Sequence, residues 1–269
     1  GTLNITGEVI KTAEIAQNGL TIAAADEDSL AGSLTTSADS LSIASGITNA
    51  GTLTFTGGNN ANAINNDGTL IYQTATNEKV TNSGKISGSG NLTITIAENG
   101  RLTNSAEIKQ NNIAFNGNGT VTNNASISAT DGTITVGEDI KVNNNEKGAL
   151  SGNITNSGSI NNGTLSGTIA NAGSISGAKV NGKLDNDGSI SNAGVTAKDG
   201  SSSSGKISLA LGEALLAEGN FTNVANAVIK GSVTANSGTF TNNGKINTGN
   251  NGGVEITSAA EFANNGTIM

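Results

Sequence analysis

The chain has 269 residues, of which 13% are charged, with a formal net charge of −8 and no Pro, Cys, His or Trp. An acidic surface whose single arginine is Arg101 repels phosphate backbones, which excludes nucleic-acid binding. No apolar run approaches the roughly 18 residues that a membrane-spanning helix needs, so no membrane span is expected.

The apolar residues are mainly Ile, Leu, Val and Ala, and aromatic residues make up only 2% of the chain. A compact globule of this size would normally bury several large aromatic side chains. The composition therefore favours a thin core built from small side chains. Residues 1–46 show no clear repeat and are expected to form irregular coils, with a loop at Ala23–Asp28.

From residue 47 onward a seven-residue pattern recurs in eleven copies: apolar, any, Asn, any, Gly or Ala, any, apolar. The first copy is Ile47–Leu53, and Ile154–Ile160 is one of the best formed. Most motif asparagines follow one another at intervals of 15–22 residues, but two gaps span 33 and 37 residues. Each long gap holds a degenerate copy, one near Val142–Leu150 and one at Ser203–Ile207, where Ser203 stands in place of Asn.

Between the motifs, apolar residues alternate with small polar ones, as in Leu92–Ile96. This period of two, rich in β-branched residues, predicts strands with one face inward. Asn and Gly both tolerate positive φ, so the Asn-x-Gly centre of each motif predicts a sharp corner. A variable repeat length on a constant core pattern is typical of a β-helix and unlike leucine-rich or helical repeats.

These patterns predict an all-β fold, a single right-handed parallel β-helix (β-solenoid) of about 14 coils with 15–22 residues per coil. One domain would cover residues 1–269, with irregular coils at 1–46 and regular motif coils at 47–268. We expect one inward row made by Ile47, Ile64, Val80, Leu102, Val121, Ile154, Ile169 and Leu184. Gly212–Gly219 alone has helix-forming content and predicts a helical turn or a strand with a corner.

Stacked coils would align the motif asparagines into a ladder, in which each side-chain amide bonds to the coils above and below, as in cross-β structures. These bonds would satisfy polar groups that are otherwise buried unpaired at the corners. The predicted structural ladder comprises Asn49, Asn66, Asn82, Asn104, Asn123, Asn156, Asn171, Asn186, Asn223, Asn242 and Asn264. We assign these asparagines no ligand role.

The sequence lacks a recognisable set of residues for catalysis, a cofactor or a metal, so we expect neither an enzyme nor a cofactor. Without His or Cys, the commonest bases and nucleophiles are missing. Acidic residues group only at Asp26-Glu27-Asp28, Glu138-Asp139 and Asp185/Asp187. The last pair flanks Asn186 and predicts an ordinary solvated corner, with a weak cation site as the alternative. Tyr72 alone is too little of an aromatic platform for sugar binding.

The Ile-Thr-Asn-Ser-Gly-Ser-Ile phrase at residues 154–160 and its relatives over residues 47–268 resemble the passenger regions of bacterial autotransporters and filamentous-haemagglutinin-like adhesins. The resemblance implies a right-handed β-helical passenger that is exported across the Gram-negative envelope and displayed on the bacterial cell surface. There it would bind host surfaces, sister cells or a matrix. The pattern specifies corners and core only, so no functional residue is carried over.

The sequence therefore predicts a non-catalytic extracellular surface protein, an adhesin passenger or stalk that presents a polar β-helical surface for cell or matrix attachment. The alternative is a structural subunit of a surface filament or surface layer that assembles end to end, because unpaired strand edges can template stacking. Such self-association along the rod axis would bring Gly1–Ile22 of one chain near Phe262–Met269 of another.

Overall fold

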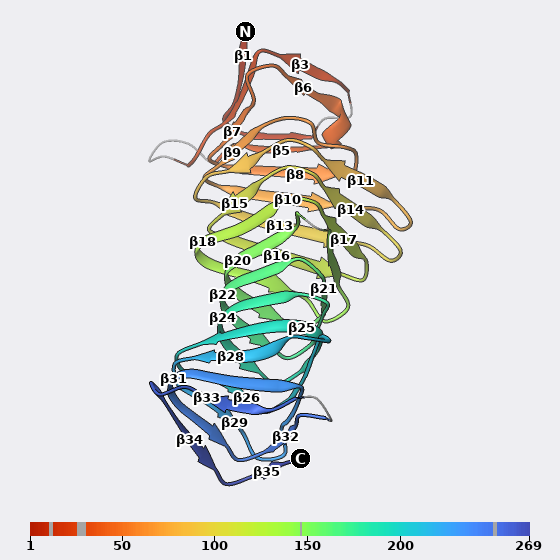
Figure 1. The fold of residues 1–269 in the computed structure, drawn as a ribbon. Helices are drawn as coiled ribbons and strands as arrows, with labels where there is room; N and C mark the ends of the chain where they lie inside the picture. Colours follow the sequence, from red (N-terminus) through yellow and green to blue (C-terminus); the bar gives the residue numbers. More distant parts are fainter. Residues whose placement is uncertain (11–12, 26–30, 146, 250–251) are drawn as a thin grey trace. The chain divides into compact units, whose positions relative to one another are not determined.

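The computed structural model describes residues 1–10, 13–25, 31–145, 147–249 and 252–269. The chain divides into two compact units, residues 1–152 and 153–269, and each is described by itself. Within the described residues the only helical element is the short 3-10 turn η1 (Ala38–Ser40). Each unit consists of about seven stacked parallel coils, so the predicted all-β solenoid of about 14 coils is confirmed (Figure 1).

Most coils contain two or three short strands joined by tight corners. The strands of the first unit are β1 (Thr2–Ile5), β2 (Glu8–Ile10), β3 (Ile15–Gln17), β4 (Gly19–Ile22), β5 (Ser33–Thr36), β6 (Leu41–Ile43), β7 (Ile47–Asn49), β8 (Thr52–Thr56), β9 (Ile64–Asn66), β10 (Thr69–Gln73), β11 (Lys79–Asn82), β12 (Ile86–Ser87), β13 (Asn91–Ile96), β14 (Arg101–Asn104), β15 (Ile108–Gln110), β16 (Asn112–Gly117), β17 (Thr120–Asn123), β18 (Ser126–Val136) and β19 (Lys141–Asn144).

The strand β20 (Ala149–Asn156) begins in the first unit and ends in the second. The strands of the second unit are β21 (Ser159–Asn161), β22 (Thr164–Asn171), β23 (Ser174–Ser176), β24 (Lys179–Asn186), β25 (Ser189–Lys198), β26 (Ser201–Ser203), β27 (Lys206–Leu209), β28 (Ala214–Glu218), β29 (Phe221–Asn223), β30 (Val228–Lys230), β31 (Ser232–Asn242), β32 (Lys245–Asn247), β33 (Val254–Ile256), β34 (Ala260–Asn264) and β35 (Thr267–Ile268).

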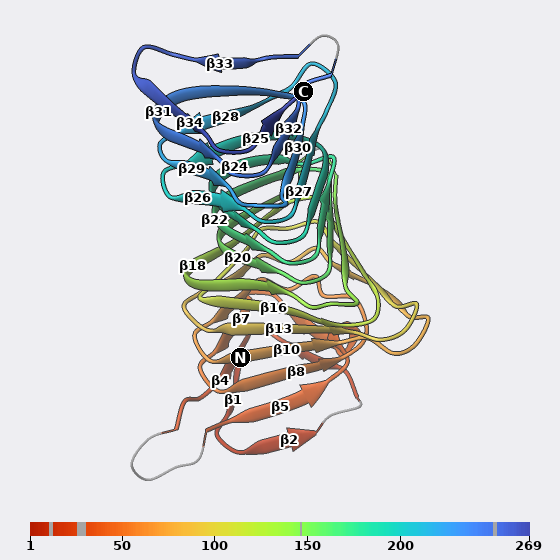
Figure 2. The ribbon, with the colours of Figure 1, turned by 90° about the horizontal axis from the view of Figure 1, so that it is seen from below.

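One face of the first unit is a parallel sheet of β5, β8, β10, β13 and β16, whose strands pair in register (Figure 2). The period of two places every second side chain inside. The inward row Leu34, Leu53, Leu70, Leu92 and Ile113 is at most 1% exposed. Full burial of one such aliphatic side chain stabilises a fold by about 1.5–3 kcal/mol, and every added coil repeats this contribution.

The eight residues of the predicted inward row are all at most 2% exposed, but they do not form one row. Ile47 pairs with Ile64 between β7 and β9, whereas Val80 pairs with Leu102 between β11 and β14. Ile64 and Val80 therefore lie at two corners of the same coil. The prediction placed them in successive coils because the seven-residue motif marks any corner between two inward strands, and this coil has two such corners.

The second unit also has rows that stay in register over many coils. One row in register passes through β21, β23, β25, β27, β30, β32 and β35, and consists of Ile160, Ile175, Ile190, Ile207, Ile229, Ile246 and Ile268. The first six are fully buried, whereas Ile268 in the last coil is 41% exposed. Successive members are 15–22 residues apart, which is the predicted coil length. Since the inward rows stay in register, the extra residues of the longer coils lie in the corners and loops.

The core also holds aromatic rings, which corrects the expectation of a core limited to small side chains. In the first unit Tyr72 packs edge-on against Phe55, with ring centroids 5.3 Å apart, and both residues are at most 1% exposed. In the second unit Phe221, Phe240 and Phe262 form a stack with centroid separations of 5.0 and 5.6 Å. Parallel in-register stacking places equivalent rings at contact distance, so a thin core accommodates them as a column.

Glycine at the motif corners serves close packing, and not the positive φ that the sequence pattern suggested. Gly173 and Gly188 lie outside the left-handed region. A Cβ atom on Gly188 would lie 2.1 Å from the carbonyl oxygen of Gly173, one coil earlier. The N–H groups of Asp187 and Gly188 both donate to the carbonyl oxygen of Asn171, at 2.9 and 2.8 Å. The missing side chain therefore lets one coil rest directly on the backbone of the previous one.

The structure gives different outcomes for the two segments predicted to be irregular, Gly212–Gly219 and Ala23–Asp28. Gly212 has a φ of 81° in a turn that leads into β28, so Gly212–Gly219 is a strand with a corner and not a helical turn. Ala23–Ala25 is irregular, as expected for a loop. The acidic group Asp26-Glu27-Asp28 lies outside the described residues.

Candidate functional site

The motif asparagines of the first unit point inward and link successive coils through their side chains. Asn49 Nδ2 donates to Asn66 Oδ1 at 2.6 Å, and Asn66 Nδ2 donates to Gln110 Oε1 at 2.5 Å. A second ladder, with Nδ2–Oδ1 distances of 2.7–3.0 Å, consists of Asn60, Asn82, Asn104, Asn123 and Asn144. The first unit therefore contains two ladders, because the motif occurs at two corners of a coil.

Three members of these ladders were missed by the motif search, namely Asn60, Gln110 and Asn144. Asn144 lies in the degenerate copy near Val142–Leu150, so the long gap between motif asparagines correctly indicated an additional coil there. Gln110 bonds to Asn66 across a coil that has Gly88 at the corner, where a Cβ atom would lie 2.2 Å from Asn66 O. The side chain of Gln110 is longer than that of Asn and reaches across this coil. No local sequence pattern predicts this contact.

The ladder of the second unit is interrupted at Ser203. Its members are Asn156, Asn171, Asn186 and Ser203, followed by Asn223, Asn242 and Asn264. Asn186 Nδ2 donates to Ser203 Oγ at 3.1 Å. Asn223 Oδ1 is buried without a hydrogen-bond partner, although Ser203 pairs with Asn223 between β26 and β29. The serine side chain is too short to carry the ladder from one coil to the next.

Replacing Ser203 with Asn is expected to stabilise the second unit by about 1 kcal/mol. The new amide would accept from Asn186 Nδ2 and donate to Asn223 Oδ1, which has no partner in the native chain. The free energy of unfolding from urea titration checks this expectation. Ser203→Ala is the matched control, because it removes the hydroxyl and supplies no donor for Asn223 Oδ1. A Ser203→Asn variant no more stable than the native chain would show that the corner has no room for the amide.

The buried ladder asparagines use their side-chain amide protons within the protein. Asn156 Nδ2 donates both to Asn171 Oδ1 at 2.7 Å and to the carbonyl oxygen of Ser174 at 3.1 Å, so both of its amide protons are used. Five ladder asparagines of the second unit are at most 2% exposed, whereas Asn264 in the last coil is exposed; the five are Asn156, Asn171, Asn186, Asn223 and Asn242. A neutral amide that is enclosed and bonded to its own kind can hold coils in register, but it cannot meet a substrate.

The predicted acidic corner at Asp185 and Asp187 is solvated. The Ser202 hydroxyl donates to Asp185 at 2.9 Å, and the Ser204 hydroxyl donates to Asp187. Both carboxylates are exposed and bonded to the next coil, as in an ordinary polar corner. Across the part of the chain that the structure describes, no group of three or more acidic, His or Cys side chains could hold a metal ion.

Tyr72 is unavailable to a ligand because it lies in the core. Its hydroxyl donates to the carbonyl oxygen of Gly58, and burial raises the pKa of the phenol above its ordinary value. The aromatic side chain with a polar tip therefore serves packing and one internal hydrogen bond.

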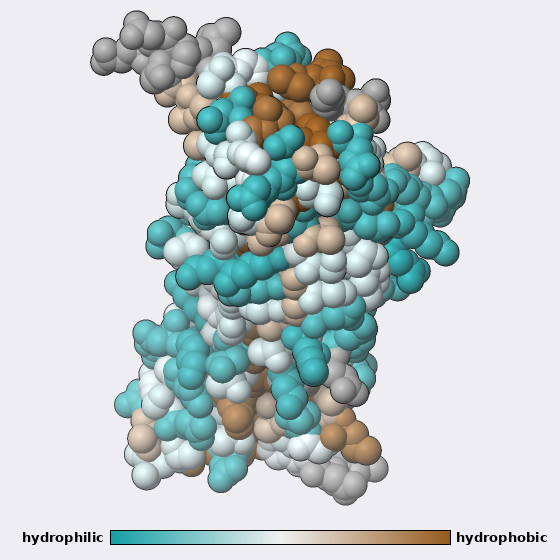
Figure 3. All heavy atoms as spheres, turned by 90° about the horizontal axis from the view of Figure 1, so that it is seen from above, coloured by the Kyte–Doolittle hydropathy of each residue, from teal (hydrophilic) through white to brown (hydrophobic). Residues whose placement is uncertain are grey.

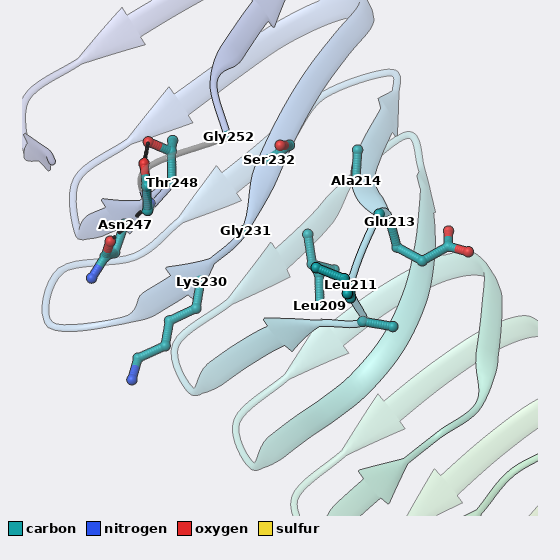
Figure 4. A pocket seen from close by; sticks show the side chains of 13 residues that line it. Leu209, Leu211, Glu213, Ala214, Lys230, Gly231, Ser232, Asn247, Thr248 and Gly252 are labelled. Atoms are coloured by element: carbon teal, nitrogen blue, oxygen red, sulfur yellow. Dashed lines mark hydrogen bonds between the residues drawn. The ribbon is translucent and has the colours of Figure 1, made fainter.

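A pocket of about 690 Å³ in the second unit lies beside the turn Leu209–Ala214 (Figure 4). Leu211, in this turn, is fully exposed. The lining contains one carboxylate, Glu213, and one ammonium group, Lys230. Figure 4 shows these two side chains pointing in different directions, so they do not form an acid–base pair.

A polar groove in the first unit follows the outer side of β7, β9, β12, β15 and β18, which pair as successive parallel strands. Its larger part, about 610 Å³, is lined by residues that include Ser87, Ser89, Lys109, Asn111, Thr130 and Asp131. Its smaller part, about 180 Å³, continues along Thr48 and Asn65. The two parts share Lys85 and Ser87, so they adjoin beside β12, and together their lining residues come from five coils.

Two carboxylates, those of Glu107 and Asp67, make polar contacts with residues that line this groove. Lys85 Nζ lies 2.7 Å from Glu107 Oε2, and the hydrogen bond and charge of Lys85 lower the pKa of Glu107. Asp67 accepts hydrogen bonds from the backbone N–H and the hydroxyl of Ser89, both at 2.9 Å, which lower the pKa of Asp67. Both carboxylates are therefore ionised at neutral pH and orient neighbouring polar groups.

Comparisons with protein-family models, with curated proteins and with solved structures give no match to this chain. Among the helices of the described residues, none has the length and apolar character needed to cross a membrane. The function is therefore inferred from the geometry and from the residues themselves.

Proposed function

We propose that this chain is a non-catalytic extracellular surface protein, an adhesin passenger or stalk displayed on a bacterial cell, whose outer faces serve attachment to cells or a matrix. The observation that supports the proposal is the separation between the inside and the outside of the coils. Inside, aliphatic rows pack against one another and the amide ladders link successive coils. Outside, each coil adds one more row of polar side chains to a long sheet face.

The surface fits recognition by extended polar faces. The face that Figure 3 shows is covered mostly by hydrophilic and neutral residues. Outward rows of the first unit combine small hydroxyl residues in register, for example Thr35 beside Thr54 and Thr52 beside Thr69. Such faces give many weak, spatially ordered contacts, which suits attachment at high copy number. The resemblance of residues 47–268 to autotransporter passengers supports the same function.

Surface display tests this proposal. The chain is fused to an outer-membrane anchor and displayed on a non-adherent Gram-negative strain, and attachment to epithelial cells, to matrix-coated plates and between sister cells is counted. We expect attachment above that of the same strain displaying an unrelated β-solenoid of equal length at equal surface density. Equal attachment of the two strains on all three surfaces would contradict the proposal.

A further inference from the structure

The polar groove of the first unit has the dimensions of an extended ligand site. It crosses five successive coils, and four steps of about 4.8 Å between neighbouring strands give a length of about 19 Å. The strands below it carry the inward row Ile47, Ile64, Ile86, Ile108 and Ile127, each at most 2% exposed. The groove therefore lies on a rigid packed sheet, and its outward side chains repeat at the spacing of the coils.

The lining offers hydrogen-bond donors and acceptors in mixed order. Hydroxyls come from Ser87 and Thr130, an amide from Asn111, an ammonium group from Lys109 and a carboxylate from Asp131. Hydroxyl and amide groups each donate and accept. A ligand matched to this lining must itself donate and accept at many points, which is the property of a chain of sugar hydroxyls.

Parts of the lining are held in place before any ligand arrives. Ser89 is fixed by its two hydrogen bonds to Asp67, and Asn65 Nδ2 donates to the other oxygen of Asp67 at 3.2 Å. The Thr130 hydroxyl donates to the carbonyl oxygen of Gln110 at 3.4 Å. Polar groups fixed in this way lose little conformational freedom when they bind a ligand.

The charges of the groove are balanced, which argues against a highly charged ligand. Lys85 is paired with Glu107, and Lys109 shares the lining with Asp131. Asp67 adds a further negative charge at the border through its contact with Ser89. A sulfated or phosphorylated chain would meet these carboxylates as well as the lysines. Apolar residues line only the smaller part of the groove, where Ile47, Ala63 and Ile64 lie beside Thr48 and Asn65.

We propose that this groove binds a neutral oligosaccharide that lies along the stacking direction, with its hydroxyls bonded to Ser87, Asn111 and Thr130 and to the ammonium group of Lys109. The inference rests on the proposed attachment function and names the chemical class of its ligand. No aromatic side chain is among the described lining residues, so binding depends on hydrogen bonds alone and is weak for one groove. Display of many copies on a cell would raise the avidity.

Titration of the ¹⁵N-labelled full chain tests the proposal by two-dimensional NMR. The probes are cellotetraose, chitotetraose and maltotetraose, with a heparin tetrasaccharide as the anionic probe. We expect saturable shifts of the amide signals of Ser87–Ser89, Lys109–Asn111 and Thr130–Asp131 with at least one neutral probe. Lys109→Met should weaken that binding about tenfold, the effect of one lost charge-assisted hydrogen bond. Lys141→Met, at an exposed lysine on β19 outside the groove, should leave it unchanged.

Ser87→Trp, which places a large side chain in the groove, should abolish the shifts while the dispersion of the remaining signals reports the intact fold. The proposal is overturned by saturation with the heparin probe alone, by shifts confined to other faces, or by no saturable shift with any neutral probe. Attachment in the display assay that persists undiminished in Ser87→Trp would also overturn it and leave the attachment function standing. Saturable binding at the groove without attachment would support the groove and remove the proposed function.

Discussion

Replacing Asn171 with Leu is expected to lower the free energy of unfolding by about 3 kcal/mol. Asn171 accepts from Asn156 Nδ2 and donates to Asn186 Oδ1, both at 2.7 Å, and is 2% exposed. Leucine fills a similar volume but makes neither bond, so Asn186 keeps a buried oxygen without a donor. Urea unfolding followed by circular dichroism measures the loss.

Asn181 provides the matched control, since it is an exposed asparagine on β24, the strand that pairs with the strand of Asn171. Asn181→Leu should change the free energy of unfolding by less than about 0.5 kcal/mol. Similar losses at positions 171 and 181 would refute an internal role for the ladder.

The pH dependence of the stability of Asn171→Asp tests the same buried position. The carboxyl group would be buried, so its pKa in the folded state should lie above its pKa in the unfolded state. A group with a raised folded pKa contributes its stability below the unfolded pKa and loses it as pH rises through the folded value. The variant should therefore be closer to the native stability near pH 3.5 than at pH 7, whereas the loss in Asn171→Leu should not follow this trend.

The architecture was predictable because the same requirement is repeated in every coil. Alternation such as that of Leu92–Ile96 predicted a strand, and β13 (Asn91–Ile96) has its leucine and isoleucines inside. The interruption at Ser203 was also visible, since the gap length showed that a coil was present without its asparagine. Local pattern and repeat length were sufficient here because both are properties of one coil.

The assignment of motifs to coils was not predictable in the first unit. Ile64 and Val80 open two copies of the motif, yet they belong to β9 and β11 of one coil. Which copies stack is decided by the pairing of strands far apart in sequence, and the motif is the same at both corners. For the same reason Gln110 was missed, because its partner Asn66 is two coils away.

The groove could not be predicted from the sequence, for a related reason. Ser87, Lys109 and Thr130 lie in three different coils, and none of them belongs to a recognised motif. Their proximity follows from the register of β12, β15 and β18, in which Ile86 faces Ile108 and Ile108 faces Ile127. A site formed by outward-facing side chains of several coils can be recognised only once the strand register is known.

The corner glycines lead to the second large expected effect: Gly188→Ala should lower the free energy of unfolding by about 2–4 kcal/mol. The added Cβ atom would lie 2.1 Å from Gly173 O and 2.6 Å from Ala172 O. Both neighbours are backbone atoms of the coil below, so neither can rotate away. Relief requires the coils to separate, which would lengthen the bond from Ser189 N to Gly173 O, now 2.9 Å.

Gly253→Ala is the control in the same unit, because a Cβ atom there has nothing within 4 Å and the backbone lies outside the left-handed region. It should leave stability unchanged or raise it by about 0.5 kcal/mol through a less flexible unfolded chain. The native chain carries Ala125 at one motif corner, where its N–H donates to the side chain of Asn123 at 3.2 Å. If Gly188→Ala cost as little as Gly253→Ala, the Gly188 corner would be able to adopt that alternative bonding, and close backbone contact would not be the reason for its glycine.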